Sequence, residues 1–210
     1  MAARNIFIFV SLLAGLATAD DFFDAQAVGP GFTEDAEWDM ESVTPLPVSL
    51  EDCWDIITSD QALNMWCPEL GGGENLGEPG VGNVRKVVLD DIVLNILSLG
   101  SVGIEQTFDV WDDEEDNIRR YSYYVSGTTR PSIMSWKAAR ENFVCEEVDD
   151  DNSVLTRTLA IEPGFLTEKL DFVVRPRLEE IVEEKCPERL LNAIEQGMLQ
   201  IENDKEKGKE

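Results

Sequence analysis

Histidine is absent from all 210 residues of the chain. Its absence excludes a Ser-His-Asp triad, a Cys-His dyad and any zinc or haem site with a histidine ligand. Basic residues are few as well, because 17 Lys and Arg stand against 43 Asp and Glu, a net charge of −26 at pH 7. Nucleic-acid binding needs a basic face that displaces counterions. We therefore expect no nucleic-acid partner.

Long apolar runs are lacking beyond the N-terminus, where residues 1–19 have the pattern of a secretory signal peptide. Arg4 supplies the positive start, residues 6–17 the apolar stretch, and Ala17-Thr18-Ala19 the cleavage pattern. The alternative is an N-terminal anchor, but the apolar run is short for a membrane span. The sequence predicts a mature chain that starts near Asp20, without stable membrane insertion, in the secretory pathway and extracellular.

Cysteine is scarce too, with four residues and no Cys-x-x-Cys motif: Cys53, Cys67, Cys145 and Cys186. Four cysteines allow three disulfide pairings, which suits an oxidising compartment. They also fit four free, buried, apolar side chains. The sequence leaves both readings open.

Residues 20–36 are predicted to form a flexible acidic leader, 37–201 a single domain, and 202–210 a disordered charged tail. The domain starts with a strand over 38–43 that ends at Pro45 and Pro47. A Ser-x-x-Asp capping pattern at Ser49 then precedes two short helices that begin at Leu50 and Asp60.

Alternating segments joined by short polar turns follow, at 84–89, 104–110, 119–125, 133–145 and 154–161. Turns this short indicate antiparallel pairing, because parallel strands need a long crossover. Residues 170–201 carry an apolar helical stripe, which Pro187 is expected to kink or break. The order predicts the α+β class, with an antiparallel sheet, helices on one of its faces and a long C-terminal helix.

This order resembles the START-related superfamily, which includes polyketide cyclases and birch-pollen-allergen-like proteins. The resemblance covers roughly residues 38–200 and is carried by Trp54, Trp66-Cys67-Pro68, Pro79-Gly80-Val81-Gly82-Asn83-Val84-Arg85, Glu105, residues 112–125, Trp136 and residues 154–161 with Glu162-Pro163. It implies a helix-grip fold whose sheet wraps around the C-terminal helix and leaves an apolar cavity. It also implies a hydrophobic ligand, such as a polyketide or a lipid, and gate loops at 94–103 and 129–133.

The resemblance also implies the site residues. Arg85 and Glu105 match the superfamily's cavity Arg and Glu, and they are the predicted catalytic residues. Trp136 stands where nearby members have Tyr; its indole N–H donates a hydrogen bond but cannot act as an acid. Tyr123, Trp136 and Trp66 are the predicted ligand contacts.

A buried Glu beside an Arg could remove a proton next to a carbonyl group while the Arg stabilises the enolate, without metal or cofactor. The chain would then bind a hydrophobic small molecule and catalyse a cyclisation or dehydration. The alternatives are a non-catalytic lipid or pigment carrier, and an Arg85–Glu105 pair that is structural or solvated. Alternation also places Glu105 opposite the apolar Ile104 and Phe108, so it points outward unless a bulge intervenes.

Acid clusters at 109–116 and 146–151 support one further alternative, an acidic secreted protein associated with calcium. Neither cluster has the EF-hand pattern, so we expect at most loose divalent cations.

Overall fold

The computed structural model describes residues 26–27, 38–69, 73–75, 80–89, 102–112, 117–128 and 136–199. The predicted signal peptide, most of the predicted leader, gate residues 94–101 and 129–133, and the tail at 202–210 lie outside these ranges.

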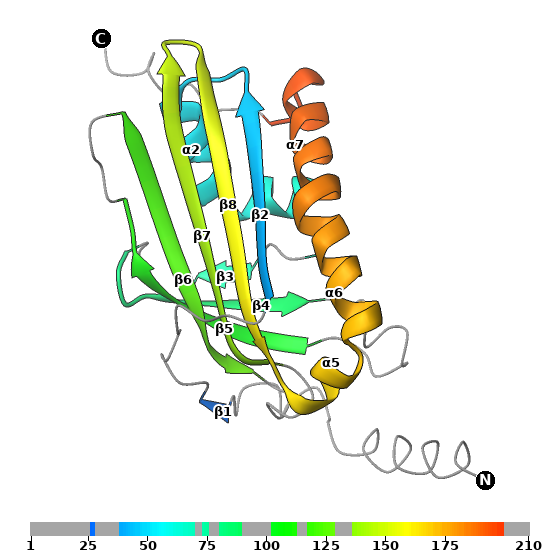
Figure 1. The fold of residues 1–210 in the computed structure, drawn as a ribbon. Coiled ribbons are helices and arrows are strands. Elements are labelled where there is room, and N and C mark those ends of the chain that lie inside the picture. Colours follow the sequence, from blue (N-terminus) through cyan, green and yellow to red (C-terminus); the bar gives the residue numbers. More distant parts are fainter. Residues whose placement is uncertain are drawn as a thin grey trace, which may run out of the picture.

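One antiparallel sheet forms the body of the protein, in the order β2-β8-β7-β6-β5-β4-β3, and β1 pairs with β6. Its strands are β1 (Gln26–Ala27), β2 (Trp38–Leu46), β3 (Gly73–Asn75), β4 (Val84–Leu89), β5 (Val102–Val110), β6 (Ile118–Thr128), β7 (Trp136–Asp149) and β8 (Asn152–Pro163). In Figure 1, β4 and β5 run across the lower part of the long strands β6, β7 and β8, so the sheet is strongly bent. The predicted antiparallel α+β class is confirmed.

The first long strand is longer than the predicted 38–43, since β2 continues through Pro45 to Leu46. β2 is an edge strand and pairs with β8 on one side only. A proline at an edge position removes no hydrogen bond that the sheet needs.

The helical segments that accompany the sheet in the described ranges are α2 (Leu50–Thr58), α3 (Asp60–Trp66), α5 (Phe165–Lys169), α6 (Asp171–Glu179), the π-helix η3 (Glu180–Lys185) and α7 (Cys186–Glu195). The predicted capping pattern is present, since the Ser49 hydroxyl accepts the Asp52 N–H at 3.2 Å. Ser59 caps α3 in the same way, through the N–H of Ala62. Both caps satisfy a backbone donor that a helix start leaves open.

The C-terminal helix lies along one face of the sheet, as Figure 1 shows. It is not broken at Pro187, which was the predicted kink, but changes to π-helix one turn earlier, at Glu180–Lys185. Pro187 lies in the first turn of α7, where the missing N–H of proline costs least.

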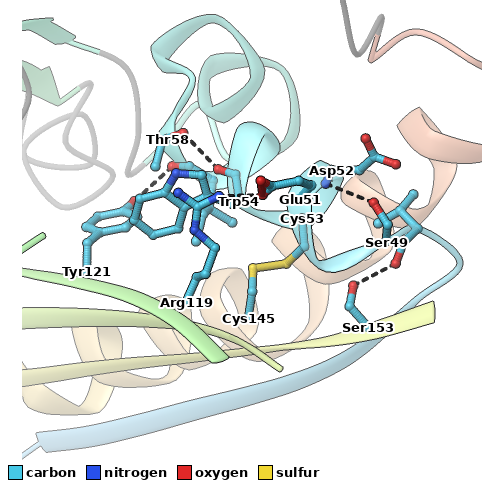
Figure 2. The surroundings of a disulfide bond; sticks show 12 residues. Ser49, Glu51, Asp52, Cys53, Trp54, Thr58, Arg119, Tyr121, Cys145 and Ser153 are labelled. Carbon is cyan, nitrogen blue, oxygen red and sulfur yellow. Dashed lines mark hydrogen bonds and ion pairs between the residues drawn. A yellow bond between two sulfur atoms is a disulfide. The ribbon is translucent and has the colours of Figure 1, made fainter. Parts of the chain in front are cut away.

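Two disulfides join the helices to one another and to the sheet. Cys53 of α2 pairs with Cys145 of β7, and Cys67 at the end of α3 pairs with Cys186 at the start of α7. The structure thus selects one of the three possible pairings and excludes free cysteines. Figure 2 shows the first bond beside Trp54, with the Arg119 guanidinium over the indole ring at 4.4 Å.

The buried residues form two apolar clusters. One packs α2, α3 and α7 against the sheet around Trp66, Tyr121 and Phe143. The other packs α6 and η3 against the bent part of the sheet around Met40, Val125 and Val182. No helix in the described ranges is both long and apolar enough to span a membrane.

Candidate functional site

A cavity of about 50 Å³ lies in the second cluster, between the inner face of the sheet and α6. Its wall is largely apolar, with a polar section, and consists of Ile104, Gln106, Tyr123, Val125, Ala139, Arg140, Glu141, Leu159, Ile161 and Leu178. The volume suffices for a few water molecules. It is well below the roughly 300–1,000 Å³ of a drug-sized pocket.

Strand alternation explains the polar section of this wall. Residues two apart on a strand share a face, so Glu141 points the same way as Ala139 and Phe143, and all three are buried. Tyr123 on β6 is the direct cross-strand partner of Glu141, and Arg157 on β8 pairs with Phe143. Arg157 is therefore the diagonal neighbour of Glu141 on the inner face, within reach of a long side chain.

These three side chains form a buried hydrogen-bonded network. The Tyr123 hydroxyl donates to Oε2 of Glu141, and Nε of Arg157 donates to Oε1 of the same carboxylate. Nη1 of Arg157 lies 3.1 Å from Sγ of Cys67, at the disulfide that connects α3 to α7. Glu141 and Arg157 are 3% and 1% exposed, so this ion pair is held away from solvent.

Arg85, a predicted catalytic residue, is buried next to this network. Its Nε donates to Oε1 of Gln106 at 2.8 Å, across the β4–β5 pair. Its guanidinium lies 5.2 Å from the ring centroid of Tyr123 and 5.5 Å from that of Phe108. Arg85 thus contacts aromatic faces and an amide, which cation–π attraction favours.

Glu105, the other predicted catalytic residue, is not brought together with Arg85. It pairs with Lys86 at 3.6 Å, and both side chains are partly exposed on the opposite face of the sheet. A register shift does occur after Glu105, but it lies in the pairing of β5 with β6. The register of β4 with β5 is regular, and it places Gln106 opposite Arg85 and Glu105 opposite Lys86. The outward orientation that alternation favoured is the one observed. The catalytic assignment of this pair stays a prediction, without the facing geometry it needs.

The three predicted ligand contacts have different positions. Tyr123 lines the cavity. Trp66 on α3 is buried beside Arg157, whose guanidinium lies 5.5 Å from its ring, but it is not part of the wall formed by the described residues. Trp136 begins β7, and its side chain lies outside the described part of the structure. Their role in binding stays a prediction.

Sequence reasoning missed Gln106, Glu141 and Arg157. The alternation of the strands could have found two of them. Glu141 has the same spacing as the buried Phe143 and Cys145 of β7, and Arg157 has the same spacing as the buried Leu155 and Leu159 of β8. A charged residue in the apolar phase of a strand indicates a buried, paired charge. The resemblance directed attention to Glu105 instead.

The acid clusters provide no metal site within the described residues, where no three acidic or cysteine side chains converge. Residues 113–116 of the first cluster lie outside those ranges. Loose association with divalent cations stays a prediction.

No family model and no curated protein matches the sequence. Solved structures match in shape. A protein from Thermus thermophilus has a TM-score of 0.52 at 16% identity, over 74% of this chain and 99% of that one. The START superfamily protein from Mycobacterium smegmatis has a TM-score of 0.51 at 16% identity, over 75% and 97%. XoxI from Bacillus cereus has a TM-score of 0.51 at 18% identity, over 74% and 94%. At identities this low, the similarity shows the fold alone. The chain has the START-like helix-grip fold that the resemblance implied.

Proposed function

We propose that the protein binds a hydrophobic small molecule between the bent sheet and α6. The observation that carries this proposal is a small cavity with a largely apolar wall and a few polar groups, namely Gln106, Tyr123 and Glu141. Small-molecule sites have this composition. Leu178 bounds the cavity on the helix side, so a ligand larger than the present volume has to displace α6 from the sheet.

Filling the cavity tests this proposal. Ala139→Leu adds a larger side chain on the cavity wall, whereas Ala160→Leu makes the same change on the partly exposed face of β8. We expect the fluorescence enhancement of N-phenyl-1-naphthylamine, a neutral apolar probe, to be lost in Ala139→Leu and kept in Ala160→Leu. Thermal unfolding of both variants controls for folding, because overpacking alone costs about 1–3 kcal/mol. Equal probe binding by both variants would refute the cavity as the binding site.

Cofactor-free acid–base catalysis is the second candidate. It is favoured by the ionisable Tyr123–Glu141 pair on the cavity wall, which Arg157 holds in place. An enzyme converts its bound ligand, whereas a carrier releases it unchanged. Native mass spectrometry of protein purified from its source, followed by incubation of the released ligand with fresh protein, separates the two. A ligand whose mass and retention time do not change supports the carrier.

We also propose that the chain enters the secretory pathway. The signal pattern in residues 1–19 supports this, as do two disulfides, which persist in oxidising compartments. N-terminal sequencing of protein from its source should find a start near Asp20. An intact N-terminus at Met1 would argue against it.

A further inference from the structure

We infer that residues 165–179, which contain α5 and α6, form a strap that lifts off the bent sheet to admit a ligand, while α7 stays in place. The inference rests on the proposed binding function and adds how the ligand reaches the site. In Figure 1, α6 and α7 form one continuous rod, so the movement needs a point at which this rod can bend.

The size of the cavity shows that the strap has to move. The volume of about 50 Å³ is well below the roughly 300 Å³ at which pockets for drug-sized ligands begin. Leu170, Val174 and Leu178 of the strap pack in the second apolar cluster. The cavity wall residues Ile104 and Val125 belong to the same cluster. Lifting the strap therefore opens and enlarges the cavity without a change in the sheet.

The contacts that hold the strap against the sheet are few. Val174 is the one buried residue of the nine in α6. The ion pairs of α6 among the described residues, Arg175–Glu179 and Arg177–Glu180, connect neighbouring turns of the same helical segment and do not reach the sheet. Segments with few buried apolar contacts open locally at a low free-energy cost.

Two consecutive irregularities allow the rod to bend at the end of the strap. Pro176 lies inside α6 and has no N–H, so the carbonyl of Phe172 lacks its helical donor. The π-helix η3 follows directly, and the N–H of Cys186 at its end donates to the carbonyl of Ile181, five residues back. Sharp bends in helices occur at prolines and at π-helical turns. The junction of α6 and η3 is therefore the hinge.

Beyond the hinge the helix is fixed in place. Ile181 of η3 is fully buried. Cys186 at the start of α7 is bonded to Cys67, and Nη1 of Arg189 lies 2.5 Å from Oε2 of Glu69. Within the described residues, α6 has no disulfide or ion pair to another layer of the fold. The movement therefore stops at η3.

Two neighbouring valines of α6 test the strap. Val174→Ala removes two buried methyl groups that hold it closed, whereas Val173→Ala makes the same change at a side chain that is 36% exposed. The measurement is the rate of the fluorescence increase of N-phenyl-1-naphthylamine in stopped-flow mixing at saturating probe, where opening limits binding. We expect Val174→Ala to raise this rate about tenfold over wild type. Val173→Ala should change it by less than about twofold.

The outcomes separate the strap from the binding function. Equal rates in the two valine variants would overturn the strap while the binding function stands. No fluorescence increase in the wild type would overturn both.

A matched pair of prolines tests the hinge. Pro176→Ala restores a backbone donor inside α6, so the rate of probe binding should fall by at least about threefold. Pro187→Ala makes the same change in the first turn of α7, beyond the hinge, and should leave the rate as in the wild type. A rate that Pro176→Ala leaves unchanged or raises would overturn the inference. If Val174→Ala does not fold, this pair decides.

Hydrogen–deuterium exchange of the wild-type protein tests the same movement without a variant or a probe. We expect the backbone amides of α6 to exchange at least about tenfold faster than those of α7, since only α6 opens. Exchange in α6 as slow as in α7 would overturn the inference.

Discussion

At the scale of single residues, the interior is organised by the ion pair between Glu141 and Arg157. Both side chains lie in the apolar phase of their strands and are almost completely buried. A buried ion pair contributes little more to the free energy of unfolding than two apolar side chains of the same volume. Removal of one partner lowers the free energy of unfolding strongly, because it leaves an isolated buried charge. We therefore expect this pair to be needed for the geometry of the cavity wall more than for net stability.

Arg157→Ala tests this expectation. The variant should lose about 3–5 kcal/mol of unfolding free energy, because Glu141 is left buried without its cation. The double variant Glu141→Leu/Arg157→Met should recover most of that loss. Urea unfolding measures both. As a control, Arg175→Ala removes a partly exposed pair with Glu179 on α6 and should cost at most about 1 kcal/mol. A double variant no more stable than Arg157→Ala would contradict the argument.

The same residues show where sequence reasoning reached its limit. Alternation around Ile104 and Phe108 correctly indicated an outward Glu105, whereas the family resemblance matched this residue to a cavity Glu. That Glu141 meets Tyr123 and Arg157 depends on the register of three strands. Register is set by pairing across the sheet, so the pattern within one strand predicts the face of a side chain but not its partner.

At the scale of elements, α3 is held against α7 by the Cys67–Cys186 disulfide and by an ion pair between Glu69 and Arg189 at 2.5 Å. Burial acts to raise the pKa of Glu69, but the hydrogen bond from Arg189, a backbone hydrogen bond and the charges of Arg189 and Lys185 together hold this pKa below its ordinary value of 4.5. The carboxylate is thus stabilised in its charged form by the fold.

This shift predicts an acid-dependent contribution to stability. A carboxyl group whose pKa is lower in the folded protein stabilises the fold above its ordinary value of 4.5, and the contribution disappears as the pH falls through the lowered pKa. Glu69→Gln should therefore have a lower Tm than wild type at pH 7, and the difference should vanish at strongly acidic pH. In a protein that already carries Arg189→Gln, Glu69→Gln should lower the Tm at pH 7 by less than it does in the wild type. A Tm difference that does not change with pH would contradict this origin.

At the scale of the whole molecule, the two disulfides close long loops, with sequence separations of 92 and 119 residues. Cross-links of this kind stabilise mainly by restricting the unfolded chain, and removal of a native disulfide costs about 2–5 kcal/mol. They connect α2 to the sheet and α3 to the C-terminal helix, around the first apolar cluster.

We expect Cys53→Ser/Cys145→Ser and Cys67→Ser/Cys186→Ser each to lower the unfolding free energy by about 2–5 kcal/mol. Probe binding should separate the two. Only the second pair removes the sulfur that Arg157 contacts, so only that variant should alter binding of the probe. Equal probe binding by both variants would show that the disulfide and the cavity are not coupled.

The sequence by itself determined the antiparallel pairing of the strands, the two short helices, the C-terminal helix and the outward face of Glu105. These features depend on local spacing, caps and turn lengths, which can be read along the chain. The tertiary structure alone decided the disulfide pairing, the π-helical segment before Pro187 and the meeting of Tyr123, Glu141 and Arg157 beside the cavity. Contacts of this kind join residues far apart in the chain, and they depend on how strands register and how the helix packs against the bent sheet.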